Sequence, residues 1–275
     1  MVSVNTFNWN IKAGLKRFLT RWPALLSIAS SVANRKNYWL ALPLIRHLRC
    51  LQLRRVTVLY PGRARGTPIV RYYWHHFLQK HRKDIQGRVL EIGTTGTVRR
   101  FGGSNVQRAE AIDIIPANDK VTIVADLAKA DHLPSDQFDC FVNQFTMHII
   151  YDFKDALYHS IRLLKPGGVL LVNFPARSGY PNEGFDLKEA GKTWVYWWFT
   201  PAVVKKVLEE LGLTEKDYEI MTYGNFFGLM AYMAGIGAEE LTPRELEYED
   251  SDIPLLICVR VVKPLQWRPK CEPQY

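Results

Sequence analysis

Short runs of apolar residues recur through the chain, and polar turns separate them. The runs cover 88–92, 109–114, 121–124, 138–143, 169–174, 218–223 and 255–262. Continuous apolar runs of about four to eight residues are typical of strands that are buried on both faces of a parallel sheet. The pattern therefore predicts an α/β protein with seven strands.

Helical periodicity falls between several of these runs. Residues 68–81 and 153–164 are predicted to form two helices. Thr200 has the character of a helix N-cap and Pro201 that of a first helical residue, so a further helix is expected to end at Leu211. The uncharged stretch 224–238 is rich in Phe, Met and Gly, and we expect a buried helix or a homodimer face there.

The turn after the first predicted strand carries the candidate chemistry. Glu91 ends the strand, Gly93 and Gly96 follow it, and Asp113 comes 22 positions after Glu91. A strand, a glycine turn and an acidic residue about 20 positions further on are typical of a nucleotide site at the carboxyl edge of a parallel sheet.

The positions of the acids favour one kind of nucleotide. A dinucleotide fold uses three glycines to approach a pyrophosphate, whereas this turn has only Gly93 and Gly96. Glu91 is a poor neighbour for a pyrophosphate but suits a cationic nucleoside without phosphates. Asp126 follows the third strand and offers an acceptor for an exocyclic amine such as that of adenine.

Taken together, the segments 88–97, 109–113, 121–126, 138–144 and 164–173 resemble the class I S-adenosylmethionine-dependent methyltransferases of the type 11 kind. The resemblance implies a Rossmann-like, seven-stranded, mostly parallel sheet with helices on both faces and an antiparallel last strand. It implies S-adenosylmethionine as cofactor, with Glu91 and Gly93 at the methionine, Asp113 at the ribose and Asp126 with Leu127 at the adenine. The full set of expected cofactor residues is Glu91, Gly93, Thr94, Gly96, Asp113, Ile114, Asp126, Leu127 and Gln144.

A narrower resemblance covers residues 60–264. The segments 65–73, 99–103, 196–200 and 239–246 look like a bacterial methyltransferase subgroup fused to, or encoded beside, glycosyltransferases. This resemblance implies a glycan or small-molecule acceptor. The expected organisation is a basic helical extension (1–55), the methyltransferase domain (56–264) and a C-terminal tail (265–275).

Two threonines depart from the family pattern. Thr95 and Thr97 stand where the pattern has glycines. A left-handed backbone at Thr95 would cost about 1–2 kcal/mol, and Gly96 could take that conformation instead by shifting the turn. One alternative is a scaffold protein that keeps the sheet but has lost the cofactor. Another is a nucleic-acid or protein methyltransferase steered by the basic N-terminal region.

Methyl transfer to an oxygen requires removal of a proton, which a histidine or a carboxylate can accept. His148, just after the fourth strand, is the candidate base, and its alternative role is that of a packed histidine beside the cofactor. The aromatic cluster near Trp197 could stack on a sugar or could be a hydrophobic plug. The expected acceptor-side residues are Arg71, Tyr72, His76, Trp197 and Trp198.

Charge is concentrated at one end of the chain. Residues 1–83 contain 16 Lys and Arg and no acidic residue, while the rest has a formal balance of −7. Such asymmetry indicates an anionic partner: lipid headgroups, nucleic acid or a phosphate-bearing substrate. Residues 1–55 mix basic and aromatic residues, and we expect either a helical cap on the domain or a second subunit, or an anionic membrane surface.

Nucleic acid is the least favoured partner, because no motif for binding it is present.

We expect a cytoplasmic protein, peripheral at the inner membrane surface if the membrane alternative holds. The four cysteines are far apart and form no C-x-x-C pair, so neither a metal site nor a disulfide is expected.

Overall fold

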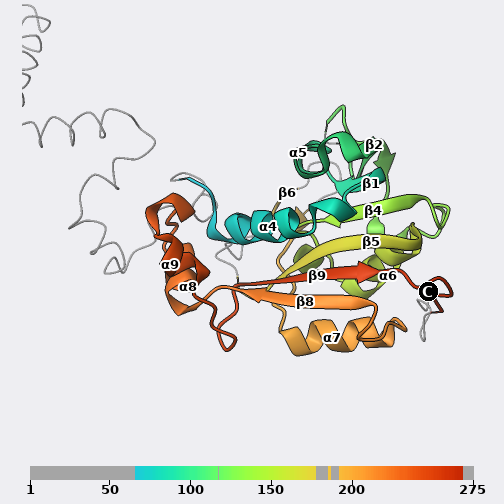
Figure 1. The fold of residues 1–275 in the computed structure, drawn as a ribbon. Helices are drawn as coiled ribbons and strands as arrows, with labels where there is room; N and C mark the ends of the chain where they lie inside the picture. Colours follow the sequence, from blue (N-terminus) through green and yellow to red (C-terminus); the bar gives the residue numbers. More distant parts are fainter. Residues whose placement is uncertain (1–65, 117, 178–184, 187–191, 269–275) are drawn as a thin grey trace, which may run out of the picture.

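The computed structural model describes residues 66–116, 118–177, 185–186 and 192–268 (Figure 1). The expected extension over 1–55 lies outside the described residues, as does the tail from 269 onward. Within the described part, no helix is long and apolar enough to cross a membrane.

A seven-stranded sheet forms the centre of the domain, in the order β3-β2-β1-β4-β5-β9-β8. Its strands are β1 (Gly87–Ile92), β2 (Val106–Asp113), β3 (Ile123–Val124), β4 (Phe138–Asn143), β5 (Leu164–Pro175), β8 (Tyr218–Tyr223) and β9 (Leu256–Val262). The first five run parallel, and β9 is antiparallel to both β5 and β8. The predicted sheet, with its antiparallel last strand, is confirmed.

Helices pack on both faces of this sheet. They are α4 (Ile69–Lys80), α5 (Gly96–Gly102), α6 (Phe153–Arg162), α7 (Pro201–Glu210), α8 (Phe226–Met233) and α9 (Pro243–Glu247). One core cluster joins α6 and α7 to the sheet, and the other joins α4, α5 and α8 to it. Short 3₁₀ turns are η3 (Arg82–Asp84), η4 (Gly103–Asn105), η5 (Leu127–Lys129), η6 (Met147–Ile149) and η8 (Ala238–Glu240), and β6 (Phe185–Asp186) pairs with β7 (Lys192–Thr193).

Helix ends agree with the sequence signals in some places and differ in others. Thr200 caps α7 by accepting a hydrogen bond from the Val203 amide, and Pro201 is its first residue, as predicted. The helix predicted over 153–164 ends two residues earlier, because Leu164 already pairs with Phe138 in the sheet.

Two helices were not predicted. α5 begins at a glycine and has no apolar stripe of useful length, so its sequence looks like a turn. α9 carries a detectable signal: Thr242 and Glu245 form a capping box around Pro243.

The stretch 224–238 is buried on one side only. Ala231 and Tyr232 of α8 belong to the core, but Phe226 and Met230 are more than a third exposed. Of the two alternatives, the buried helix is therefore wrong, because α8 packs on α4 and its outer face is exposed in the described part of the chain. The homodimer face stays a prediction.

Candidate functional site

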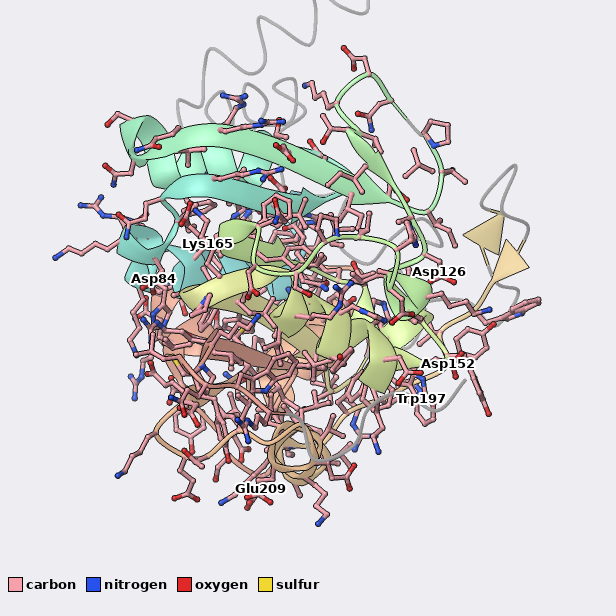
Figure 2. All side chains as sticks on the ribbon, turned by 90° about the vertical axis from the view of Figure 1, so that its right-hand side faces the viewer. Asp84, Asp126, Asp152, Lys165, Trp197 and Glu209 are labelled. Carbon is pink, nitrogen blue, oxygen red and sulfur yellow. The ribbon has the colours of Figure 1, made fainter. Side chains whose placement is uncertain are left out.

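A cavity of about 750 Å³ opens at the carboxyl ends of β1, β2 and β4. Figure 2 shows Asp126, Asp152 and Trp197 on this side of the molecule, and Asp84 and Lys165 on the opposite side. Ligands of doubly wound sheets bind at this edge. The cavity is lined by Arg71, Ile92, Gly93, Thr94, Thr97, Ile112, Asp113, Ile114, Ala125, Asp126, Leu127, Ala128, Lys129, Gln144, Phe145, Thr146, Ile149, Ile150, Tyr151, Asp152 and Tyr196.

The turn after β1 places a glycine against an acid. Gly93 has a φ of +68°, a left-handed conformation that side chains disfavour. A Cβ at this position would lie 3.1 Å from Oδ2 of Asp113, so the contact is tight as well. The backbone of the turn and the Asp113 carboxylate therefore form one continuous part of the wall.

The threonines in this turn introduce no left-handed strain. Thr95 has a φ of −118°, and Gly96 is simply the first residue of α5. The expectation that Gly96 takes a left-handed conformation is wrong, because Gly93 alone provides it in this turn. The departure from the family pattern thus leaves the turn intact.

Glu91 stabilises this turn through hydrogen bonds without lining the cavity. Its side chain is fully buried and does not line the cavity. Its two carboxylate oxygens accept hydrogen bonds from the amides of Thr97 (3.3 Å) and Val98 (2.9 Å), in the first turn of α5. Burial raises the pKa of Glu91, and hydrogen bonds from Thr97, Val98 and Gln144 oppose that rise.

Gln144 connects this carboxylate to α4. Its Nε2 donates to Oε1 of Glu91 (2.8 Å) and to Oγ1 of Thr97 (3.0 Å). Its Oε1 accepts a hydrogen bond from Nε1 of Trp74, at 3.0 Å. Since both ends of the amide are used, its orientation is fixed. Trp74 was not predicted from the sequence, where it looks like an ordinary core residue of the helix.

The opposite end of the cavity is formed after β2 and β3. Oδ1 of Asp126 accepts a hydrogen bond from the Ala128 amide and so caps η5. Leu127 and Ile114 add apolar surface to the same cavity wall. An acid in a wall with apolar surface suits an adenine ring and its amine.

Phe145 lies in the wall with a φ of +51°, which is rare for a bulky residue. Its amide donates to Oδ1 of the buried Asn173 at 2.8 Å, which holds the backbone in place. The Arg71 guanidinium lies 5.1 Å from the centre of the Phe145 ring. Strained residues of this kind concentrate at binding sites, and no sequence signal indicates this one.

The structure does not place His148 in the cavity wall. Its imidazole is buried, and burial lowers its pKa to about 4, so the ring is neutral at neutral pH. Its backbone carbonyl accepts hydrogen bonds from the amides of Tyr196 (2.9 Å) and Trp197 (3.2 Å). His148 thus positions the aromatic segment that borders the cavity.

The predicted acceptor residues are divided among several places. Trp197 donates from Nε1 to the carbonyls of Ile150 and Tyr151, both at 3.0 Å, and packs on Phe153. Trp198 is half exposed and does not line the cavity, whereas Tyr196, which was not predicted, does.

The predicted residues of α4 face two different cavities. Arg71 lines the main cavity, together with the residues expected to bind the cofactor. Tyr72 and His76 instead line a separate cavity of about 170 Å³. The described residues contain no group of side chains that could hold a metal ion.

Most residues of the cavity wall belong to a stretch that matches a known family. Residues 90–172 match the sequence model of a family described as a methyltransferase domain. These residues therefore resemble a methyltransferase domain. The match begins in β1 and ends in β5, and it includes every lining residue of the cavity except Arg71 and Tyr196. The expectation of a methyltransferase agrees with this match. S-adenosylmethionine as its cofactor stays a prediction.

Solved methyltransferases are among the similar structures. An S-adenosylmethionine-dependent methyltransferase from Archaeoglobus fulgidus is 16% identical, with a TM-score of 0.45 over 70% of this chain and 94% of that one. The N-methyltransferase NodS from Bradyrhizobium japonicum WM9, in complex with S-adenosylhomocysteine, is 16% identical, with a TM-score of 0.44 over 76% and 95% of the two chains. No curated protein matches the chain.

Asp113 should bind the ribose of the cofactor through charge-assisted hydrogen bonds. Asp113→Ala should weaken S-adenosylmethionine binding by about 1.5–3 kcal/mol, the usual contribution of a charged hydrogen bond. Isothermal calorimetry measures this change. Asp119→Ala, in the exposed loop after β2, is the matched control and should keep wild-type affinity. Equal affinity of all three proteins would show that Asp113 does not bind the cofactor.

Trp74 should support cofactor binding without touching the cofactor. Trp74→Phe removes its hydrogen bond to Gln144, and loss of one neutral hydrogen bond should weaken S-adenosylmethionine binding about fivefold. Trp267→Phe removes a comparable bond to the Leu211 carbonyl, far from the cavity, and should leave the affinity unchanged. If both variants bind S-adenosylmethionine like wild type, the hydrogen bond from Trp74 to Gln144 does not contribute to cofactor affinity.

Proposed function

We propose that this methyltransferase acts on a hydroxyl oxygen of a small-molecule or glycan acceptor. The observation that carries the proposal is the composition of the cavity wall beyond the cofactor end. That part combines a cation from α4, a carboxylate and two tyrosine rings, supplied by Arg71, Asp152, Tyr151 and Tyr196. Polar groups and aromatic faces together suit a sugar or another polar ring.

The tyrosines form the outer rim of this end. Tyr151 and Tyr196 contact each other edge to face, with ring centres 5.4 Å apart. Trp197 supports this rim, because its indole Nε1 donates hydrogen bonds to the backbone carbonyls of Ile150 and Tyr151. A rigid aromatic rim can orient an acceptor and displace water from it.

When bound, S-adenosylmethionine supplies a methyl group on a positively charged sulfur. The protein has to align the acceptor oxygen with that methyl group and remove the hydroxyl proton. Asp152 is the carboxylate at the acceptor end of the wall, and in this proposal it accepts the proton. His148 then acts through its backbone carbonyl, which positions Tyr196.

The glycan part of the proposal rests on the resemblance of 65–73 and 239–246 to methyltransferases associated with glycosyltransferases. In the structure these two segments are adjacent: Thr67 donates to Glu239 from its amide (2.8 Å) and from its hydroxyl (2.6 Å). Their contact supports the idea that the matching positions form one structural unit.

The proposal predicts O-methylation and a role for Tyr196. The protein is incubated with S-adenosylmethionine carrying an isotope-labelled methyl group and with panels of sugars, phenols and amines. Mass spectrometry and the chemical shift of the labelled carbon identify the methylated atom. We expect label on oxygen, and label found only on nitrogen would contradict the proposal.

With the accepted substrate, Tyr196→Ala should raise the acceptor KM several-fold while cofactor affinity stays within about twofold, the pattern of a lost acceptor contact. Trp198→Ala is the matched control two residues further on, and its kinetics should resemble wild type. An unchanged KM in Tyr196→Ala would remove Tyr196 from the acceptor site.

A further inference from the structure

The outer face of α8 is apolar and exposed in the described part of the chain. Phe226, Met230 and Met233 are spaced as one side of a helix, and they are 57%, 40% and 45% exposed. Tyr248, just after α9, is 67% exposed. These four residues form what we call the α8–α9 surface. Figure 1 shows α8 and α9 together beside the start of α4. Asn225, at the start of α8, donates a hydrogen bond to the Tyr248 carbonyl at 2.7 Å, so Tyr248 lies close to this helix. Exposed apolar side chains that lie near one another indicate an interaction site.

The border of the α8–α9 surface is strongly acidic. Residues 239–252 contain seven acidic residues and one basic residue. The exposed acids among them are Glu239, Glu247, Glu249 and Asp252. This acidic border would repel an anionic membrane. A partner of the α8–α9 surface should therefore be both apolar and basic.

A small cavity at the same end fits a basic side chain. It has a volume of about 170 Å³, and three tyrosines and two glutamates contribute to its wall: Tyr72, Tyr73, Tyr223, Glu247 and Glu249. The Tyr73 and Tyr223 rings are stacked with centres 5.8 Å apart. Aromatic faces next to carboxylates are a favourable environment for an ammonium or guanidinium group.

The chain itself contains a segment with the matching chemistry. Residues 1–65 have 12 basic residues, no acidic residue and many apolar and aromatic ones. They join the described fold at this border. Thr67 donates two hydrogen bonds to Glu239, its carbonyl accepts one from the Ala238 amide, and Pro68 pairs with Gly237.

We propose that residues 1–65 of the same chain cover the α8–α9 surface, with a lysine or arginine side chain in the tyrosine–glutamate cavity. The covalent connection at Gly66 keeps this segment at a high effective concentration near the surface, so modest contacts suffice. The basic extension then acts as a cap on the catalytic domain, and its aromatic residues cover α8.

The test is limited proteolysis of the full chain with trypsin, which cleaves after the basic residues of 1–65. In wild type these sites should be protected at low salt, equally at all protein concentrations. The double variant Glu247→Gln/Glu249→Gln should be cut about fivefold faster, because exposed charge pairs contribute modestly. The control Asp119→Asn/Glu209→Gln removes two acids elsewhere and should stay protected.

Met230→Ser tests the apolar contact independently and should also increase cleavage. Thermal melting followed by circular dichroism shows that each variant is folded. Equal cleavage of wild type and both α8–α9 variants would overturn the proposal. Protection that disappears on dilution would overturn it in favour of a second copy. Protection that appears only with phosphatidylglycerol vesicles would overturn it in favour of a membrane.

Discussion

A buried carboxylate ties the end of β1 to the start of α5, and the shape of the cofactor cavity depends on it. A carboxylate without solvent is unfavourable unless its oxygens accept hydrogen bonds. Glu91 meets this requirement with the Thr97 and Val98 amides and with the Gln144 side chain. Amides at a helix start are also favourable neighbours for a negative charge. Because both ends of the intervening turn are fixed, Gly93 presents its left-handed backbone to the cavity.

Much of the fold can be read from the sequence, because strands buried in a parallel sheet leave continuous apolar runs. β4 and β8 have the predicted ends, and α7 begins at its predicted cap. The start of β2 and the length of β5 could not be predicted, because pairing with neighbouring strands extends them beyond their apolar runs. α5 could not be predicted either, because its first turn is stabilised by a hydrogen bond from the Val98 amide to Glu91, which lies outside the helix on β1.

The two ends of the cavity differ in how far the sequence predicts them. The proposed cofactor end comes from turns that directly follow strands, so spacing was sufficient to place Gly93, Asp113 and Asp126 in the cavity wall. The proposed acceptor end is assembled from α4, from the segment after β4 and from the segment after β7. Which of several aromatic residues faces it depends on backbone contacts such as those of Tyr196 and Trp197 with His148.

The most direct test of the role of Glu91 is a crystal structure of the protein with S-adenosylhomocysteine bound. The quantity to measure is the set of distances from the Glu91 oxygens to the Thr97 and Val98 amides and to the ligand. We predict that both amide hydrogen bonds persist and that the ligand contacts the turn at Gly93 without touching Glu91. A Glu91 carboxylate that has left α5 and binds the ligand directly would contradict this account.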